Sequence, residues 1–201
     1  MEGRRVVNNI TNVARIFFIK TIYSMLLALF NIVTNTAFPF IPIQITLIDL
    51  AIEGYTSFFL SFLENSKPLK GTFLRTVIRN ALPYALTIII SIILITFTRS
   101  GMGLNIEESH TLMYLIIGGV SIFAVIEACR PFNRISTFLC TTTAVGFFFA
   151  AILFKKLLHL TAINEQVILI LGASLILAYI VVTGLKYLIN NLSNDLEKAR
   201  E

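Results

Sequence analysis

The sequence predicts an all-α, polytopic membrane protein with six transmembrane helices, and three observations support this fold class. Hydrophobic residues make up 56% of the 201 residues and charged residues only 13%, whereas soluble domains carry about 25% charged residues. Mean hydropathy is +0.84. The apolar residues are gathered in runs close to the roughly 20 residues that cross a bilayer as a helix. No Lys/Arg cluster is interleaved with aromatics, so no nucleic-acid partner is expected.

Each apolar run predicts one membrane helix. Pro39 and Pro42 end the first and begin the second, because proline is favoured in the first turn of a helix and disfavoured in its interior. The third run is short, and the sequence RTVIRNALPYAL before it is suited to extend it. The six predicted helices span residues 14–33, 43–63, 82–97, 111–128, 136–154 and 167–185.

Polar segments flank this membrane region at both ends. Residues 1–13 are polar but carry apolar residues at helical spacing, which predicts a cytosolic stalk that extends the first helix. Residues 14–189 are the predicted six-helix transport domain, and residues 190–201 a cytosolic tail with a frayed amphipathic end.

The distribution of basic residues predicts that both termini are cytosolic. Twelve of the 16 Lys and Arg residues, including Lys67, Lys70 and Arg200, fall before the first helix, in alternate loops or after the last helix. Three fall on the other side, and Lys20 lies within a predicted helix. An excess of positive charge marks the cytosolic side.

The cysteines and histidines carry no metal-binding or redox motif. Cys129 is expected at a helix end and Cys140 inside a helix, both as inert thiols. His110 and His159 are interpreted as ordinary residues of outer loops.

Four charged residues fall inside predicted membrane helices: Lys20, Asp49, Glu53 and Glu127. A charged side chain near a helix centre costs about 2.5–3.5 kcal/mol, so each needs a partner, water or an ion. Asp49 and Glu53 are four residues apart and share one helix face. Because two close carboxylates cannot both stay ionised without a counter-charge, one must bind a proton, a cationic side chain or a metal ion.

Structural explanations compete with each of these functional ones. Lys20 is able to neutralise one of the two acids as a plain ion pair, and Glu127 is close enough to Arg130 for a surface pair. Gly54 permits either helix unwinding or close helix packing. Neighbouring side chains with oxygen atoms are candidate ligands for a hard cation: Thr21, Ser24, Gln44, Thr46, Thr56 and Ser57. Hydroxyl groups in membrane helices, however, mostly bond to carbonyl oxygens of their own helix.

Three segments together resemble one family. EGRRVVNNITNVARIFFIKTIYS resembles the stalk and fifth membrane helix of P-type cation-transporting ATPases, which begin with EGR and then NN. FPFIPIQITLIDLAIEG resembles the following loop and sixth helix of the calcium-pump branch, with the pattern IPxQLLWVNLVTDG. VIEACRPFN resembles the IEMCNALN of the eighth helix. The six helices then correspond to membrane helices five to ten of a bacterial-type pump.

The resemblance implies a role for each matching residue. Asp49, Glu53 and Glu127 fall on ligand positions of the calcium pumps, so they are the implied metal ligands. Thr21 and Ser24 fall on the ligand asparagine and glutamate of the fifth helix, so a full two-calcium site is not expected. Lys20 resembles the internal cation of the proton/potassium pump. A divalent ion is favoured, calcium first, with magnesium or manganese next.

The family's DKTGT and TGE motifs do not occur in the sequence. The resemblance therefore implies a partial chain, with the phosphorylated Asp, ATP and its magnesium belonging to the missing N-terminal half. The expected partners are that half, the transported ion and the lipid bilayer, and the expected location is the plasma membrane. Two alternatives stay open: a stand-alone six-helix channel or proton-coupled carrier, and an inactive remnant.

Overall fold

The computed structural model of the chain describes residues 2–62 and 72–198, and these form only helices and their connections. The helices are α1 (Glu2–Thr34), α2 (Pro42–Ile48), the π-helix η1 (Asp49–Gly54), α3 (Tyr55–Leu60), α4 (Phe73–Thr98), α5 (Ile106–Ala128), α6 (Arg134–Leu153) and α7 (Glu165–Lys198).

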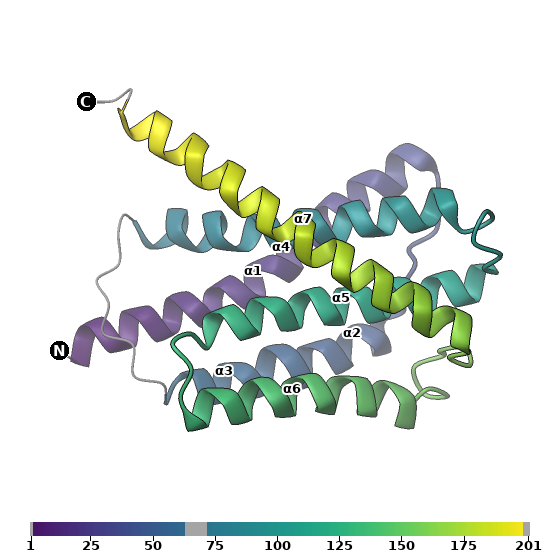
Figure 1. Ribbon diagram of the computed structural model, residues 1–201, viewed down its shortest axis with the longest axis horizontal. Coiled ribbons are helices and arrows are strands. Elements are labelled where there is room, and N and C mark those ends of the chain that lie inside the picture. The colour runs from purple at the N-terminus through teal and green to yellow at the C-terminus, as the bar shows by residue number, and fades with distance from the viewer. Residues whose placement is uncertain (1, 63–71, 199–201) are drawn as a thin grey trace.

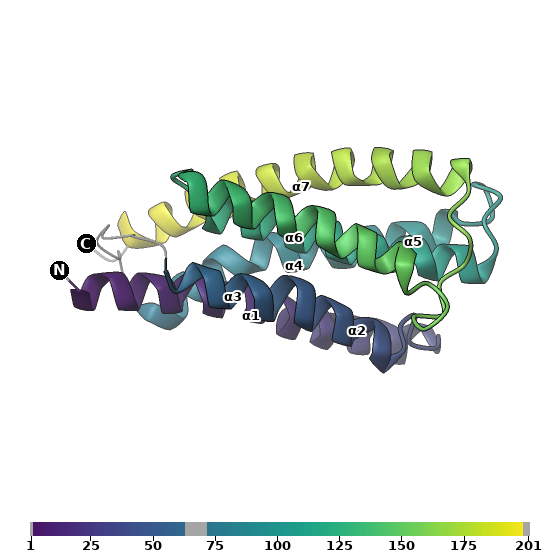
Figure 2. The same ribbon diagram turned by 90° about the horizontal axis from the view of Figure 1, so that it is seen from below.

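Six of the helical units are long and apolar enough to cross a membrane, which confirms the predicted all-α, six-helix fold class. One of the six consists of α2, η1 and α3, which follow one another without a break from Pro42 to Leu60. The units run up and down along one long axis. The N-terminal end of α1 and the C-terminal end of α7 therefore lie at the same end of the molecule (Figures 1 and 2). That this end is cytosolic stays a prediction.

Four helices extend well beyond the apolar runs that predicted them. Helix α1 continues back to Glu2, α4 begins at Phe73 instead of residue 82, and α7 continues to Lys198. Asn105 and Asn133 each cap the helix that follows them. Helix α6 begins at Arg134, close to its predicted start at residue 136, whereas α5 begins at Ile106 instead of residue 111. Leu63, Lys67, Lys70 and Arg200 lie outside the described residues.

Helix α5 is the centre of the bundle and is buried along most of its length. Two glycines allow its neighbours to approach closely. A Cβ on Gly118 would lie 2.1 Å from the Phe147 ring of α6, and one on Gly119 would lie 2.4 Å from Leu175 of α7. This agrees with the packing role expected of small residues between membrane helices.

Candidate cation site

The candidate site is built on η1, in the middle of the second membrane-crossing unit. The backbone N–H of Tyr55 donates to the carbonyl oxygen of Leu50, which is the spacing of a π-helix. A Cβ on Gly54 would lie 3.1 Å from the carbonyl oxygen of Asp49, a tight contact. Glycine at this position therefore leaves room for the wider turn, and single π-turns in α-helices are frequent at functional sites.

Lys20 of α1 lies between the two acidic side chains of η1. Its Nζ is 2.6 Å from Oδ1 of Asp49 and 3.0 Å from Oε2 of Glu53. The Glu53 side chain is only 3% exposed, whereas that of Asp49 is 44% exposed. We call Lys20, Asp49 and Glu53 the acidic cluster, because with all three groups ionised it carries one net negative charge.

The acidic cluster has the donor chemistry of a site for a hard cation. Carboxylate oxygens are the preferred ligands of calcium and magnesium. The lysine ammonium already occupies the space between the carboxylates, so an entering cation must displace it or share the two acids with it. The sequence indicated an ion pair between Lys20 and one of the two acids, whereas in the structure Lys20 contacts both Asp49 and Glu53.

The hydroxyl groups near the acidic cluster mostly bond to their own helices. Thr21 donates to the Phe17 carbonyl at 3.2 Å, and Ser57 donates to the carbonyl of Glu53 at 2.5 Å. Thr46 and Thr56 bond back in the same way, to Pro42 and Ile52. Both ends of the Gln44 amide are already hydrogen-bonded. Its oxygen accepts from the backbone N–H of Ile41, and its nitrogen donates to the carbonyl oxygen of Leu158.

Ser24 differs from these residues by its position. It is half-buried and lies one turn after Lys20 on α1. Residues four apart share a helix face. Ser24 is therefore on the same face of α1 as the lysine of the acidic cluster.

Glu127 lies in a second group of charges, near the end of α5. Its Oε1 is 3.4 Å from Nη1 of Arg15. Its Oε2 accepts a hydrogen bond of 2.5 Å from the Tyr84 hydroxyl and forms an ion pair with Nζ of Lys186. Lys186 also donates to the Tyr84 oxygen at 2.7 Å. We call these four residues the basic cluster, since two cations surround one carboxylate.

The two clusters are separate in the described part of the chain. No three His, Cys, Asp or Glu side chains come together there in a group that could hold a metal ion, so Glu127 does not join Asp49 and Glu53. The ion pairs of Glu127 are with Arg15 and Lys186 and not with Arg130, the neighbour considered from sequence. Sequence reasoning missed Arg15, Tyr84 and Lys186 as partners, although a lysine near the last apolar run was a usable signal.

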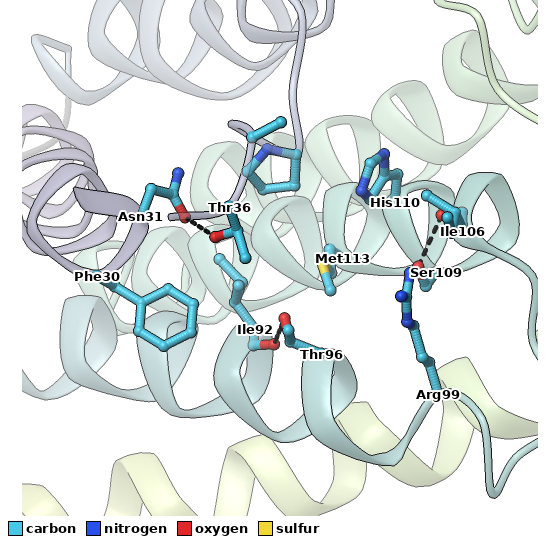
Figure 3. Close-up of a pocket in the computed structure, with 12 residues that line it drawn as sticks. Phe30, Asn31, Thr36, Ile92, Thr96, Arg99, Ile106, Ser109, His110 and Met113 are labelled. Carbon is cyan, nitrogen blue, oxygen red and sulfur yellow. Dashed lines mark hydrogen bonds between the residues drawn. The ribbon is translucent and has the colours of Figure 1, made fainter. Parts of the chain in front are cut away.

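A pocket of about 230 Å³ opens at the opposite end of the bundle, between α1, α4 and α5 (Figure 3). Its wall is mostly apolar, and its charged or titratable side chains are Arg99 and His110, with no carboxylate. It is therefore unsuited to bind a cation and is distinct from the acidic cluster. His110 was expected in a loop, but the structure places it in the first turns of α5, because this helix begins at Ile106.

The two cysteines lie where they were expected. Cys129 directly follows α5 and is buried, and Cys140 lies inside α6; both thiols are free.

Known proteins resemble this chain over most of its length. No family model matches it. It is 40% identical over 186 residues to a probable cation-transporting ATPase of Streptococcus pneumoniae, covering 87% of this chain and 24% of that protein. It is 28% identical over 182 residues to the calcium-transporting ATPase CtpE of Mycolicibacterium smegmatis, covering 83% of this chain and 23% of that protein.

The chain thus spans about a quarter of the length of the curated relatives that it matches. Six membrane-crossing units and the similarity to cation-transporting ATPases together define a multi-pass integral membrane protein segment. The chain is therefore a relative of the P-type cation-transporting ATPases and corresponds to part of their membrane domain.

Proposed function

We propose that the chain forms the cation-translocating membrane part of an ATP-driven pump, with Asp49 and Glu53 as the residues that bind the transported ion. One observation carries this proposal: two carboxylates on a π-turn in the middle of a membrane-crossing unit are balanced by a single lysine. A charged group at this depth is expensive and is usually retained for transport or pairing. Here the pairing is incomplete, because one negative charge remains.

The ion is proposed to be divalent, with calcium ahead of magnesium and manganese. Two carboxylates provide up to four oxygens, and Thr21 and Ser24 on α1 are proposed to add hydroxyl oxygens when the ion is bound. Gly54 allows η1 to open further, which would free backbone carbonyls for the ion. CtpE, a relative of this chain, is named a calcium-transporting ATPase, and this supports the order of preference.

Lys20 is proposed to act as an internal counter-cation. In the absence of the transported ion its ammonium neutralises part of the charge of Asp49 and Glu53. The entering ion competes with it for the same oxygens, so Lys20 lowers the affinity and helps release. We propose the plasma membrane as the location.

The exposure of Asp49 indicates that another part of the pump covers this face of the second membrane-crossing unit. Its side chain is 44% exposed, and the next residue, Leu50, is 70% exposed. A carboxylate does not face acyl chains without a large cost. Because the relatives are about four times as long, we propose that helices of the N-terminal half of the pump cover this face, and that ATP and its magnesium bind to domains of that half.

The test uses the full-length pump that contains this segment. We expect D49N and E53Q each to raise the calcium concentration for half-maximal ATPase activity, because each removes a charged ligand. For the buried Glu53 we expect a rise of about tenfold or more, which corresponds to about 1.4 kcal/mol of binding free energy. The matched control is E165Q, the same change at an exposed acid in the first turn of α7. Unchanged calcium dependence in both site variants would refute the assignment, and parallel titrations with magnesium and manganese rank the ions.

A further inference from the structure

We propose that Glu127 is a positioning residue: its carboxylate anchors Arg15, and this contact holds α1 at the place where Lys20 reaches Asp49 and Glu53. The inference rests on the proposed cation site, and it gives Glu127 a role other than that of an ion ligand.

The first step is that the carboxylate of Glu127 is fully used. One oxygen faces Arg15, and the other accepts from Tyr84 and Lys186. A divalent cation at Glu127 would have to break these contacts. It would also lie close to two fixed positive charges, and the repulsion between like charges at short range is strong where little water is present.

The second step is that Arg15 ties α1 to the end of α5. Its side chain is only 6% exposed, and Nη2 donates to the carbonyl oxygen of Ala124 at 2.9 Å while Nη1 faces Glu127. A buried guanidinium that loses its carboxylate partner strongly destabilises the folded protein. Glu127 therefore keeps Arg15 in this position, and with it the part of α1 that carries it.

The third step connects Arg15 to the acidic cluster. Arg15 and Lys20 are both in α1 and lie about 7.5 Å apart along its axis and about 140° apart around it. Arg15 therefore points to α5 while Lys20 points to η1. Contacts on two different faces fix both the height and the rotation of α1, so releasing Arg15 loosens the hold of Lys20 on Asp49 and Glu53.

The experiment compares E127Q in two backgrounds of the full-length pump, one with Lys20 and one with K20M. Because Lys20 competes with the ion, E127Q is expected to lower the calcium concentration for half-maximal ATPase activity by roughly threefold when Lys20 is present. In the K20M background the same change is expected to have an effect below about 1.5-fold, since coupled sites are not additive. R15Q is a second variant, with the same expected decrease, in case E127Q does not fold.

Two results would overturn the proposal. If E127Q raises the half-maximal calcium concentration in both backgrounds, Glu127 is a ligand. If it has no effect in either, Glu127 is merely structural and does not position Lys20.

A thermal measurement without calcium separates this proposal from the proposed function. E127Q should lower the unfolding midpoint, and E127Q/R15Q should recover most of the loss, because the buried guanidinium left without its carboxylate is removed. E107Q, at an exposed acid in the first turn of α5, is the control. If the pump shows no calcium response at all, the proposed function fails. In that case, recovery of the unfolding midpoint in the double variant still supports the role of Glu127 in holding Arg15, and a double variant without recovery refutes it.

Discussion

The acidic and basic clusters are opposite solutions to the same problem of holding charge among membrane helices. In the acidic cluster one lysine serves two carboxylates, and in the basic cluster two cations and a tyrosine serve one carboxylate. The first keeps a surplus negative charge that can be satisfied by an added cation. The second has no unsatisfied acceptor to offer one. The difference indicates that a carboxylate inside a membrane protein must be interpreted together with its neighbours.

Removing the central cation of the acidic cluster should have the largest effect. In K20M, Asp49 and Glu53 face each other without a counter-charge, and breaking a buried pair costs about 3–5 kcal/mol. We expect this loss in the free energy of unfolding, measured in detergent without divalent ions. Added calcium should restore most of it, and the calcium affinity should exceed that of the unmodified protein.

The control for this prediction is K156M, which removes an exposed lysine beyond α6. It should change neither stability nor the response to calcium. A K20M protein that is as stable as its parent in calcium-free buffer would contradict the view that Lys20 balances the two acids.

A lysine of the basic cluster should matter much less. In K186M the carboxylate of Glu127 keeps Arg15 and Tyr84, and the repulsion between the two cations disappears. We expect a loss of about 1–2 kcal/mol, the range of one charge-assisted hydrogen bond, and no change in calcium affinity. The same unfolding measurement, with K155M as the exposed control, checks it; a loss equal to that of K20M would mean that the two clusters do not differ as described.

Sequence reasoning reached the acidic cluster more fully than the basic one, for a physical reason. Lys20, Asp49 and Glu53 stand out because each is a costly charge inside an apolar run, and Gly54 beside them indicated an irregular backbone. Arg15 and Lys186 lie at the ends of such runs, where basic residues are common and indicate only topology. Their meeting at Glu127 depends on how α1, α5 and α7 pack, which periodicity does not encode.

The same limit explains the helix boundaries. Hydropathy marks the part of a helix that lies in the membrane, so it predicted all six units. It does not mark where a helix ends in water. The polar residues before the first and third apolar runs indicated that α1 and α4 extend, whereas α7 continues past its predicted end at residue 185.

The π-turn beneath the acidic cluster should show an intermediate effect. Alanine at an ordinary exposed helix glycine stabilises by about 0.5–1 kcal/mol, and G146A in α6 meets no atom within 4 Å. G54A meets the Asp49 carbonyl oxygen at 3.1 Å, so we expect it to lose this gain and to weaken calcium binding. Equal stabilisation by both substitutions, with unchanged calcium affinity, would show that η1 does not need glycine.

The last comparison separates a buried hydroxyl that makes hydrogen bonds from one that does not. Tyr84 is buried, donates to Glu127 and accepts from Lys186, so Y84F should cost about 0.5–1.5 kcal/mol. Tyr114 is equally buried, and its hydroxyl has no hydrogen-bond partner among the described residues. Because an unpaired buried hydroxyl is itself unfavourable, Y114F should leave the free energy of unfolding unchanged or raise it. The two tyrosine variants thus compare the same lost atom in and out of the basic cluster, and equal losses would mean that Tyr84 adds nothing to the hold on Glu127.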